Sequence, residues 1–253
     1  MRRVLLTFGS ILLAAGCGSE TIVPETGAAG IPLSISGNQT PNATGANAAS
    51  NTTISQYSDS VRQLLQKANA GVVAGNHAIA IEAISQAISL APDDASLFRI
   101  RADVYVLHGE NANARVDFSM AIRLAPNDAD YYNYRGYFLM SQRLTKEAVA
   151  DFEKAVQLDP AHAAALNNRG LISLTNEDYK SAEADFSKAI DGDRQFADAW
   201  NNRGFTRFKL NQFETALSDL QQALRIQENY VTAWNNSGLI YMQQKKYEDA
   251  LKA

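Results

Sequence analysis

Apolar and small residues recur in a fixed pattern from residue 61 onwards. Each unit has a large residue at the fourth position and a small residue at the eighth, and the five full units have small, large and small residues at the 20th, 24th and 27th positions. The first group falls on one face of a helix and the second group on one face of a following helix. The pattern therefore predicts helix pairs in successive units of 34 residues: 61–94, 95–128, 129–162, 163–196, 197–230 and a partial sixth, 231–253.

Alanines and prolines divide each unit. Alanine at the 20th position of every unit and a small residue at the eighth position let the two helices approach closely. Pro92, Pro126 and Pro160 cannot continue a helix, so we expect them to end the first three units. The fourth unit has Gly192 and Arg194 in this region. We therefore expect the second helix of the fourth unit to end differently.

This order of large, small, small, large, small and proline resembles the tetratricopeptide repeat family over residues 58–253. The resemblance implies an all-α fold: a right-handed solenoid of five full repeats and one partial repeat, with the first helices lining a concave face. It also implies a module that binds proteins or peptides. Because the sequence stops within the sixth repeat, we expect either a fragment or a last apolar face that meets a partner.

An arginine stands at the seventh position of four repeats, where many members of the family carry leucine. A buried guanidinium is costly unless it is paired. An aspartate follows each arginine sixteen residues later, and the first and sixth units lack both residues. We predict structural ion pairs within the repeats; the alternative is that the arginines line an anion-binding groove. The predicted pairs are Arg101–Asp117, Arg135–Asp151, Arg169–Asp185 and Arg203–Asp219.

Asparagines fill the fifth and sixth positions of several repeats, next to apolar residues at the ninth. An asparagine side chain both donates and accepts hydrogen bonds, which suits it to holding the backbone of an extended peptide. The series resembles the asparagine ladder in the repeat domain of O-linked N-acetylglucosamine transferases. Alternatively, these residues belong to a repeat consensus and pack between repeats. The candidate residues of a concave peptide-binding groove are Asn133, Tyr137, Asn167, Asn168, Leu171, Asn201, Asn202, Phe205, Asn235 and Asn236.

The N-terminus has the organisation of a secretory signal. Arg2 and Arg3 precede a short apolar segment, and small residues lead into Cys17, the only cysteine. This resembles the lipobox of bacterial lipoproteins, which implies a signal peptide over 1–16, acylation of Cys17 with fatty acids such as palmitate, and anchoring in the cell envelope. Gly18 in place of aspartate favours the outer membrane, facing the periplasm. Residues 17–57 have the composition of a flexible tether. The alternatives are an ordinary signal peptide and an uncleaved anchor.

Composition and motifs narrow the function. The formal net charge of −4 lacks the basic excess of nucleic-acid-binding proteins. The sequence has no glycine-rich phosphate loop, nucleophile elbow or zinc-protease motif, so we predict no catalytic residue, cofactor or metal. The sequence favours a membrane-anchored scaffold or adaptor for proteins of the cell envelope. The alternatives are the substrate-recruiting part of a longer enzyme, such as a glycosyltransferase, and a self-assembling structural protein.

Overall fold

The structure is a computed structural model that describes residues 57–244. The signal peptide, Cys17, the tether up to residue 56 and residues 245–253 lie outside the described residues, together with the predictions made for them. Within residues 57–244 every regular element is an α-helix. The helices are α2 (Asp59–Val73), α3 (His77–Leu90), α4 (Ala95–His108), α5 (Asn111–Leu124), α6 (Ala129–Ser141), α7 (Thr145–Leu158), α8 (Ala163–Thr175), α9 (Tyr179–Gly192), α10 (Ala197–Lys209), α11 (Phe213–Ile226) and α12 (Val231–Gln243).

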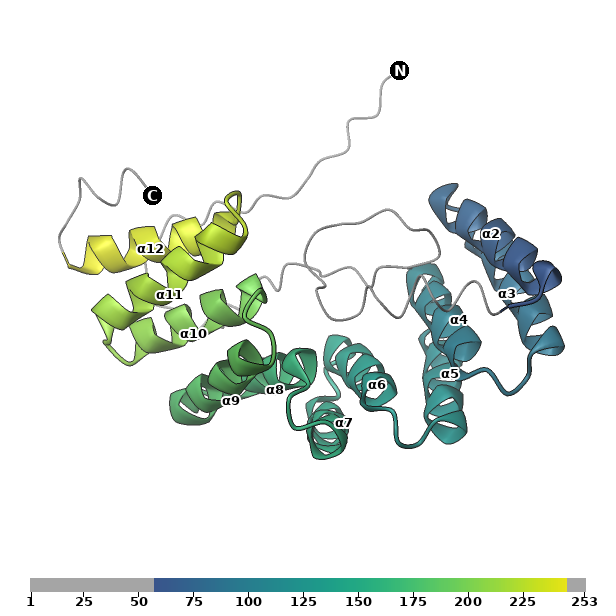
Figure 1. The fold of residues 1–253 in the computed structure, drawn as a ribbon, viewed down its shortest axis with the longest axis horizontal. Helices are drawn as coiled ribbons and strands as arrows, with labels where there is room; N and C mark the ends of the chain where they lie inside the picture. Colours follow the sequence, from purple (N-terminus) through teal and green to yellow (C-terminus); the bar gives the residue numbers. More distant parts are fainter. Residues whose placement is uncertain (1–56, 245–253) are drawn as a thin grey trace, which may run out of the picture. The chain divides into compact units, whose positions relative to one another are not determined.

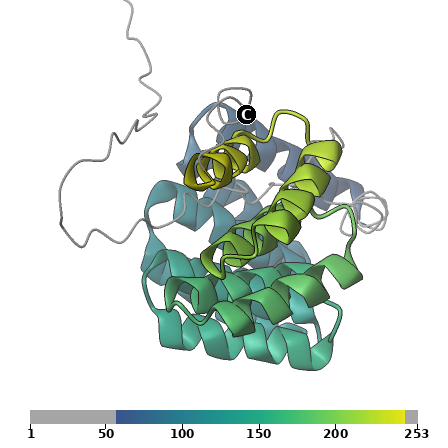
Figure 2. The ribbon, with the colours of Figure 1, turned by 90° about the vertical axis from the view of Figure 1, so that its left-hand side faces the viewer.

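The helices pack as hairpins that follow one another in sequence order (Figure 1). Each even-numbered helix from α2 to α10 is the first helix of a repeat, and it packs most extensively against the helix that follows it. Figures 1 and 2 show consecutive hairpins side by side, and the first helices α6, α8, α10 and α12 also contact one another in turn. The predicted all-α solenoid of helix hairpins is confirmed. None of the helices within residues 57–244 is long and apolar enough to span a bilayer.

Glycines let the two helices of a hairpin approach closely. Phe186 on α9 is fully buried, and a Cβ atom added at Gly170 on α8 would lie 2.7 Å from its Cε1 atom. Gly136 and Phe152 repeat this arrangement between α6 and α7, with a distance of 2.8 Å. The phenylalanine ring thus fills the space that a side chain at the eighth position would take.

The second helix of each repeat ends at the same position. The residue after it has a non-helical backbone, with φ between −131° and −142°, and its N–H group donates to the carbonyl of the alanine at the 27th position. α9 ends at Gly192 in the same way, so the expectation of a different ending is wrong. The reason is that the cap at the 31st position ends the helix before the proline position is reached.

Gly192 serves a close contact with the neighbouring loop. A Cβ atom at this position would lie 2.3 Å from the carbonyl oxygen of Ala161, in the loop before α8. Even a methyl group cannot fit this close to a fixed backbone oxygen. The glycine is therefore required by packing between the end of α9 and the start of α8.

Aromatic residues at the fourth position fasten the loops between repeats. The indole Nε1 of Trp200 donates to the carbonyl oxygen of Arg194 at 3.0 Å, and Trp234 donates to that of Glu228 at the same distance. The hydroxyl of Tyr132 donates to the carbonyl oxygen of Pro126 at 3.1 Å. In each case the partner lies six residues earlier, in the loop that leads into the aromatic residue's own helix.

Candidate functional site

The structure places each predicted arginine directly against its aspartate. In all four pairs, Nε and Nη2 of the arginine donate to the two carboxylate oxygens at 2.6–2.9 Å. The aspartates are buried, and the arginine side chains are 13–26% exposed. Such two-point contacts fix the orientation of both side chains, so each pair holds the first helix of a hairpin against the second.

In three of the four pairs, a serine on the preceding hairpin accepts a hydrogen bond from the third guanidinium nitrogen. Nη1 donates to Ser85 from Arg101 at 3.0 Å, and the equivalent bonds to Ser119 and Ser187 measure 3.2 Å. Each serine lies sixteen residues before its arginine, just as the aspartate lies sixteen residues after it. We did not predict these serines, although their spacing is visible in the sequence. Each of these arginines therefore joins two repeats.

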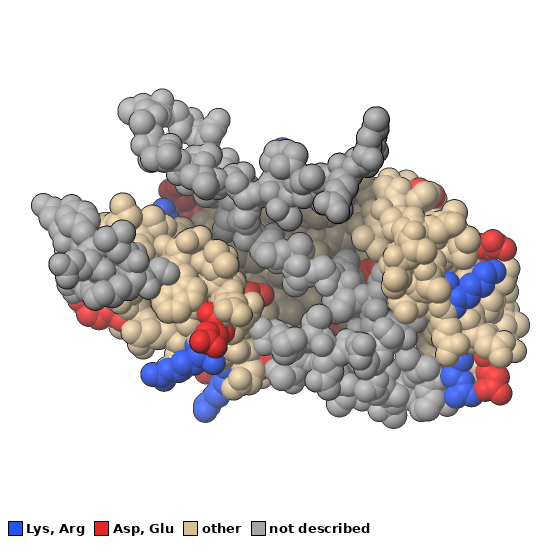
Figure 3. Space-filling view, turned by 90° about the horizontal axis from the view of Figure 1, so that it is seen from above, with Lys and Arg blue, Asp and Glu red and all other residues tan. Residues whose placement is uncertain are grey.

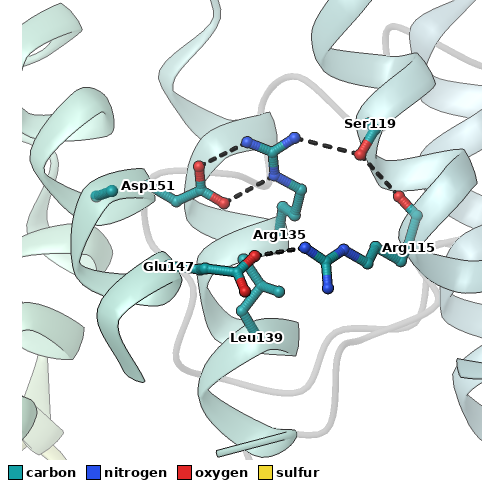
Figure 4. Close-up of a pocket in the computed structure, with 7 residues that line it drawn as sticks. Arg115, Ser119, Arg135, Leu139, Glu147 and Asp151 are labelled. Carbon is teal, nitrogen blue, oxygen red and sulfur yellow. Dashed lines mark hydrogen bonds and ion pairs between the residues drawn. The ribbon is translucent and has the colours of Figure 1, made fainter. Parts of the chain in front are cut away.

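The surface cavity around Arg135 contains ion pairs rather than unpaired charges (Figure 4). It has a volume of about 280 Å³ and lies between α5, α6 and α7. Arg115 pairs with Glu147 across this space, while Arg135 contacts Asp151 and Ser119. Because both guanidinium groups already face carboxylates, the geometry favours a structural role over the alternative of an anion-binding groove.

The asparagines form hydrogen bonds between the first helices of neighbouring repeats. The side-chain amide of Asn168 donates to Asn133 at 3.0 Å, Asn202 to Asn167 at 3.0 Å, and Asn236 to Asn201 at 2.9 Å. In each bond the donor lies 35 residues after the acceptor. The acceptors and Asn236 are buried, Asn168 and Asn202 are half-buried, and Asn235 is exposed. Most of these candidate groove residues thus link repeats to one another.

Equivalent positions at the preceding junction hold a different pair. Arg99 and Tyr134 are also 35 residues apart, and the guanidinium carbon lies 5.2 Å from the centre of the tyrosine ring. Nη1 of Arg99 also donates to Oδ2 of Asp103 at 2.6 Å. Burial raises the pKa of Asp103 to about 6, and the nearby guanidinium offsets only part of this shift. A guanidinium over a ring therefore replaces the amide contact between α4 and α6, and an ion pair within α4 holds that guanidinium.

The apolar candidates differ in how much of each side chain is exposed. Leu171 is buried, whereas Tyr137 and Phe205 are half-buried. The equivalent position in the sixth repeat, Leu239, is 47% exposed, and Met242, one helical turn further on, is 56% exposed. Exposed apolar surface on the first helices is therefore greatest towards α12. Residues 57–244 contain no cluster of three side chains that would hold a metal ion.

Solved structures resemble this chain at low sequence identity. PilW, a widely conserved type IV pilus biogenesis factor, is 21% identical; the match covers 78% of this chain and 91% of PilW, with a TM-score of 0.65. PilF of Pseudomonas aeruginosa is 18% identical over 77% of this chain and 88% of its own, with a TM-score of 0.67. YrrB, described as a repeat protein with an unusual peptide-binding site, is 22% identical over 78% and 97%, with a TM-score of 0.50.

Family models identify the repeats themselves. No curated protein matches the sequence. Models described as tetratricopeptide repeat match residues 65–129, 118–162, 135–199, 197–230 and 231–253. These matches cover most of the chain, and up to residue 244 they overlie the helix hairpins of the structure. The chain therefore belongs to the tetratricopeptide repeat family.

Proposed function

We propose that the protein is a non-catalytic interaction module of the cell envelope, which binds an extended segment of a partner protein along its first helices. One observation carries this proposal. Apolar side chains recur at equivalent positions of successive first helices, and those of α12 are about half exposed. A row of such positions suits an extended chain, because both repeat along one direction.

In this proposal, fewer of the asparagines contact the peptide than the sequence alone predicts. Asn133, Asn167 and Asn201 use their side-chain oxygens to bind the next repeat. We therefore assign peptide contact to Tyr137, Phe205, Leu239 and Met242, together with the exposed amide of Asn235 and the half-buried amides of Asn168 and Asn202. The buried asparagines align the helices that carry these side chains.

The envelope location is supported by two separate observations. The N-terminal sequence resembles a lipoprotein signal. PilW, one of the structurally similar proteins, is described as a type IV pilus biogenesis factor. We propose that lipid on Cys17 anchors the chain and that the polar segment after it extends the repeats away from the membrane. Several acyl chains at one residue give stable anchoring, since each buried CH₂ contributes about 0.8 kcal/mol.

Site-specific crosslinking tests the binding face. A photo-crosslinking amino acid at position 239 or 205 of the full chain in cells is expected to capture the same partner, and the additional changes Leu239→Glu and Met242→Glu are expected to abolish capture from position 205. Val116 on α5 is 63% exposed and supplies the control. A crosslinker at 116 is expected to capture nothing, and Val116→Glu is expected to leave capture from 205 unchanged. Equal capture from positions 116 and 205 would refute the proposed face.

Anchoring has its own test. Cells fed a palmitate analogue are expected to label the wild-type chain and not the Cys17→Ser variant, and fractionation is expected to release that variant from membranes. Membrane retention of Cys17→Ser without label would contradict lipid anchoring and leave the binding face unaffected.

A further inference from the structure

The helices α4 and α6 carry a charged and aromatic cluster that the later first helices lack. It consists of Arg99, Asp103, Tyr131, Tyr134 and Asp130. Arg99 pairs with Asp103 and lies over the ring of Tyr134, and the ring centre of Tyr131 is 6.4 Å from that of Tyr134. In later repeats the positions of Arg99 and Asp103 hold asparagines and apolar residues. The second and third repeats therefore offer different chemistry from the rest of the face.

One carboxylate oxygen in this cluster has no hydrogen-bond donor. Asp103 is 2% exposed; its Oδ2 accepts from Arg99, but its buried Oδ1 accepts no hydrogen bond. Buried polar atoms are seldom left without a partner, and each such atom is costly. A donor supplied by a bound group would remove this cost. Because Asp103 already pairs with Arg99, the remaining acceptor suits an additional N–H group.

The surroundings of the cluster favour a positive charge. Asp94 and Asp128 cap α4 and α6, and Asp130 lies in the first turn of α6 with its side chain 60% exposed. Asp130 accepts from Nε2 of His162 at 3.0 Å, and this bond lowers the pKa of Asp130. Nδ1 of His162 accepts from the N–H of Ala165, and the hydrogen bond and charge of Asp130 raise the pKa of the ring although it is buried.

The local carboxylates therefore outnumber the one guanidinium. Where Figure 3 leaves the surface uncovered, Asp and Glu side chains show near the middle of the view as well as at its edges. Opposite charge attracts over about 10 Å at moderate salt. Aromatic rings next to carboxylates also suit a cation, which the ring faces attract.

We propose that this cluster binds a basic side chain, lysine or arginine, on the partner segment that lies along the same face. This inference rests on the proposed function and adds a specificity to it. Because Oδ1 of Asp103 is buried, binding requires the groups that cover it to move aside. The incoming N–H groups then supply the donor that this atom lacks, and the stem lies against Tyr131 and Tyr134. The chain's own tether is a poor occupant, because residues 18–56 contain Glu20 and Glu25 but no lysine, arginine or histidine.

Fluorine NMR of the full chain labelled with 3-fluorotyrosine tests the proposal. Signals of Tyr131 and Tyr134 are identified from Tyr131→Phe and Tyr134→Phe. Titration with Nα-acetyl-arginine methylamide is expected to shift these signals saturably, with a dissociation constant of about 1–10 mM, the scale of a single side chain. The citrulline analogue, which has the same shape without the charge, is expected to bind at least about tenfold more weakly.

Variants separate the possible outcomes. Asp103→Asn and Asp130→Asn are each expected to weaken arginine binding about five- to tenfold. Asp191→Asn on α9 makes the same charge change at an exposed position and is expected to have no effect. Equal binding of arginine and citrulline, preferential binding of the acetyl-glutamate analogue, or full binding by Asp130→Asn would each overturn the proposal. The crosslinking test at positions 205 and 239 is independent, so failure of the proposed function is distinguishable from failure of this site.

Discussion

At the scale of single residues, the four paired arginines differ in one contact. Arg101, Arg135 and Arg203 each bind an aspartate within the hairpin and a serine on the preceding one. Arg169 binds Asp185, but the position of the serine is taken by Glu153, which is exposed. Arg169 thus joins the two helices of its own hairpin without the serine bond, and the charge of Glu153 on the preceding hairpin stabilises its guanidinium instead.

The Arg169–Asp185 pair is testable with a double-mutant cycle. Arg169→Ala and Asp185→Ala are each expected to lower the free energy of unfolding by about 3 kcal/mol, because the remaining partner is left partly buried without its counter-charge. The double variant is expected to lose less than the sum, with a coupling energy of about 1–3 kcal/mol in urea denaturation. Arg194→Ala, at an exposed arginine, supplies the control. A coupling energy of zero would contradict the structural role.

Asp103 gives the stability a specific pH dependence. Because burial raises its pKa from 3.8 to about 6, the folded state binds more protons than the unfolded state between these values. Its ionisation therefore destabilises the fold as pH rises from about 4 to 6, by up to about 3 kcal/mol. Subtracting the unfolding free energies of Asp103→Asn from those of wild type over this range isolates the effect, since other groups cancel. A difference that does not change with pH would mean that Asp103 has an ordinary pKa.

Sequence reasoning found the pairs within repeats but not those between them. Arginine and aspartate are present together in four repeats and absent together in the first and sixth, so the sequence alone relates the two positions. The contacts of Asn168 with Asn133 and of Arg99 with Tyr134 depend on how neighbouring hairpins rotate against each other. That rotation follows from the packing of whole side-chain layers, and no single position in the sequence specifies it.

At the scale of helices and loops, backbone caps and the close approach of neighbouring loops determine how the second helix of each repeat ends. The caps after the second helices are alike whether the next residues include Pro160 or Arg194. The sequence therefore predicted the helices correctly and misjudged one boundary, because proline is only one of several residues found after a helix. The unusual residue, Gly192, reflects contact with Ala161, which lies 31 positions earlier.

Gly192→Ala tests this close contact. The added methyl group would collide with the carbonyl oxygen of Ala161 at 2.3 Å, and a backbone atom in a packed loop cannot move without cost. We expect a loss of about 1–3 kcal/mol in the free energy of unfolding, by analogy with overpacked cores. Asp191→Ala, at the exposed neighbour, is expected to change it by less than about 0.5 kcal/mol. Equal stability of Gly192→Ala and wild type would show that the loop adapts freely.

At the scale of the whole repeat array, stability depends on contacts between neighbours. Within residues 57–244 each hairpin packs extensively only against adjacent hairpins, so the array unfolds as one unit only if each junction is strong enough. The junctions between α6, α8, α10 and α12 each contain an amide hydrogen bond, whereas the junction of α4 and α6 contains Arg99 and Tyr134. Asn168 and Asn202, which we expect to contact the peptide, therefore also couple the repeats that display them.

Asn167→Ala is expected to weaken this coupling. Its loss leaves the amide of Asn202 without the acceptor at 3.0 Å, which costs about 1–2 kcal/mol. Because the weakened junction lies within the array, the urea transition is expected to broaden, with a smaller m-value. Asn235→Ala, at an exposed amide, is the matched control and is expected to leave both midpoint and slope unchanged. An unchanged slope for Asn167→Ala would show that the amide bonds do not couple the repeats.

The aromatic bonds to the inter-repeat loops have a spectroscopic consequence. The chain has two tryptophans, Trp200 and Trp234, and both indole groups bind the loop just before their own helix. Fluorescence emission of the intact chain therefore originates from the fifth and sixth repeats, while the first four are visible only through their tyrosines. With Trp200→Phe or Trp234→Phe, the remaining indole becomes a local optical reporter of when its own loop comes free.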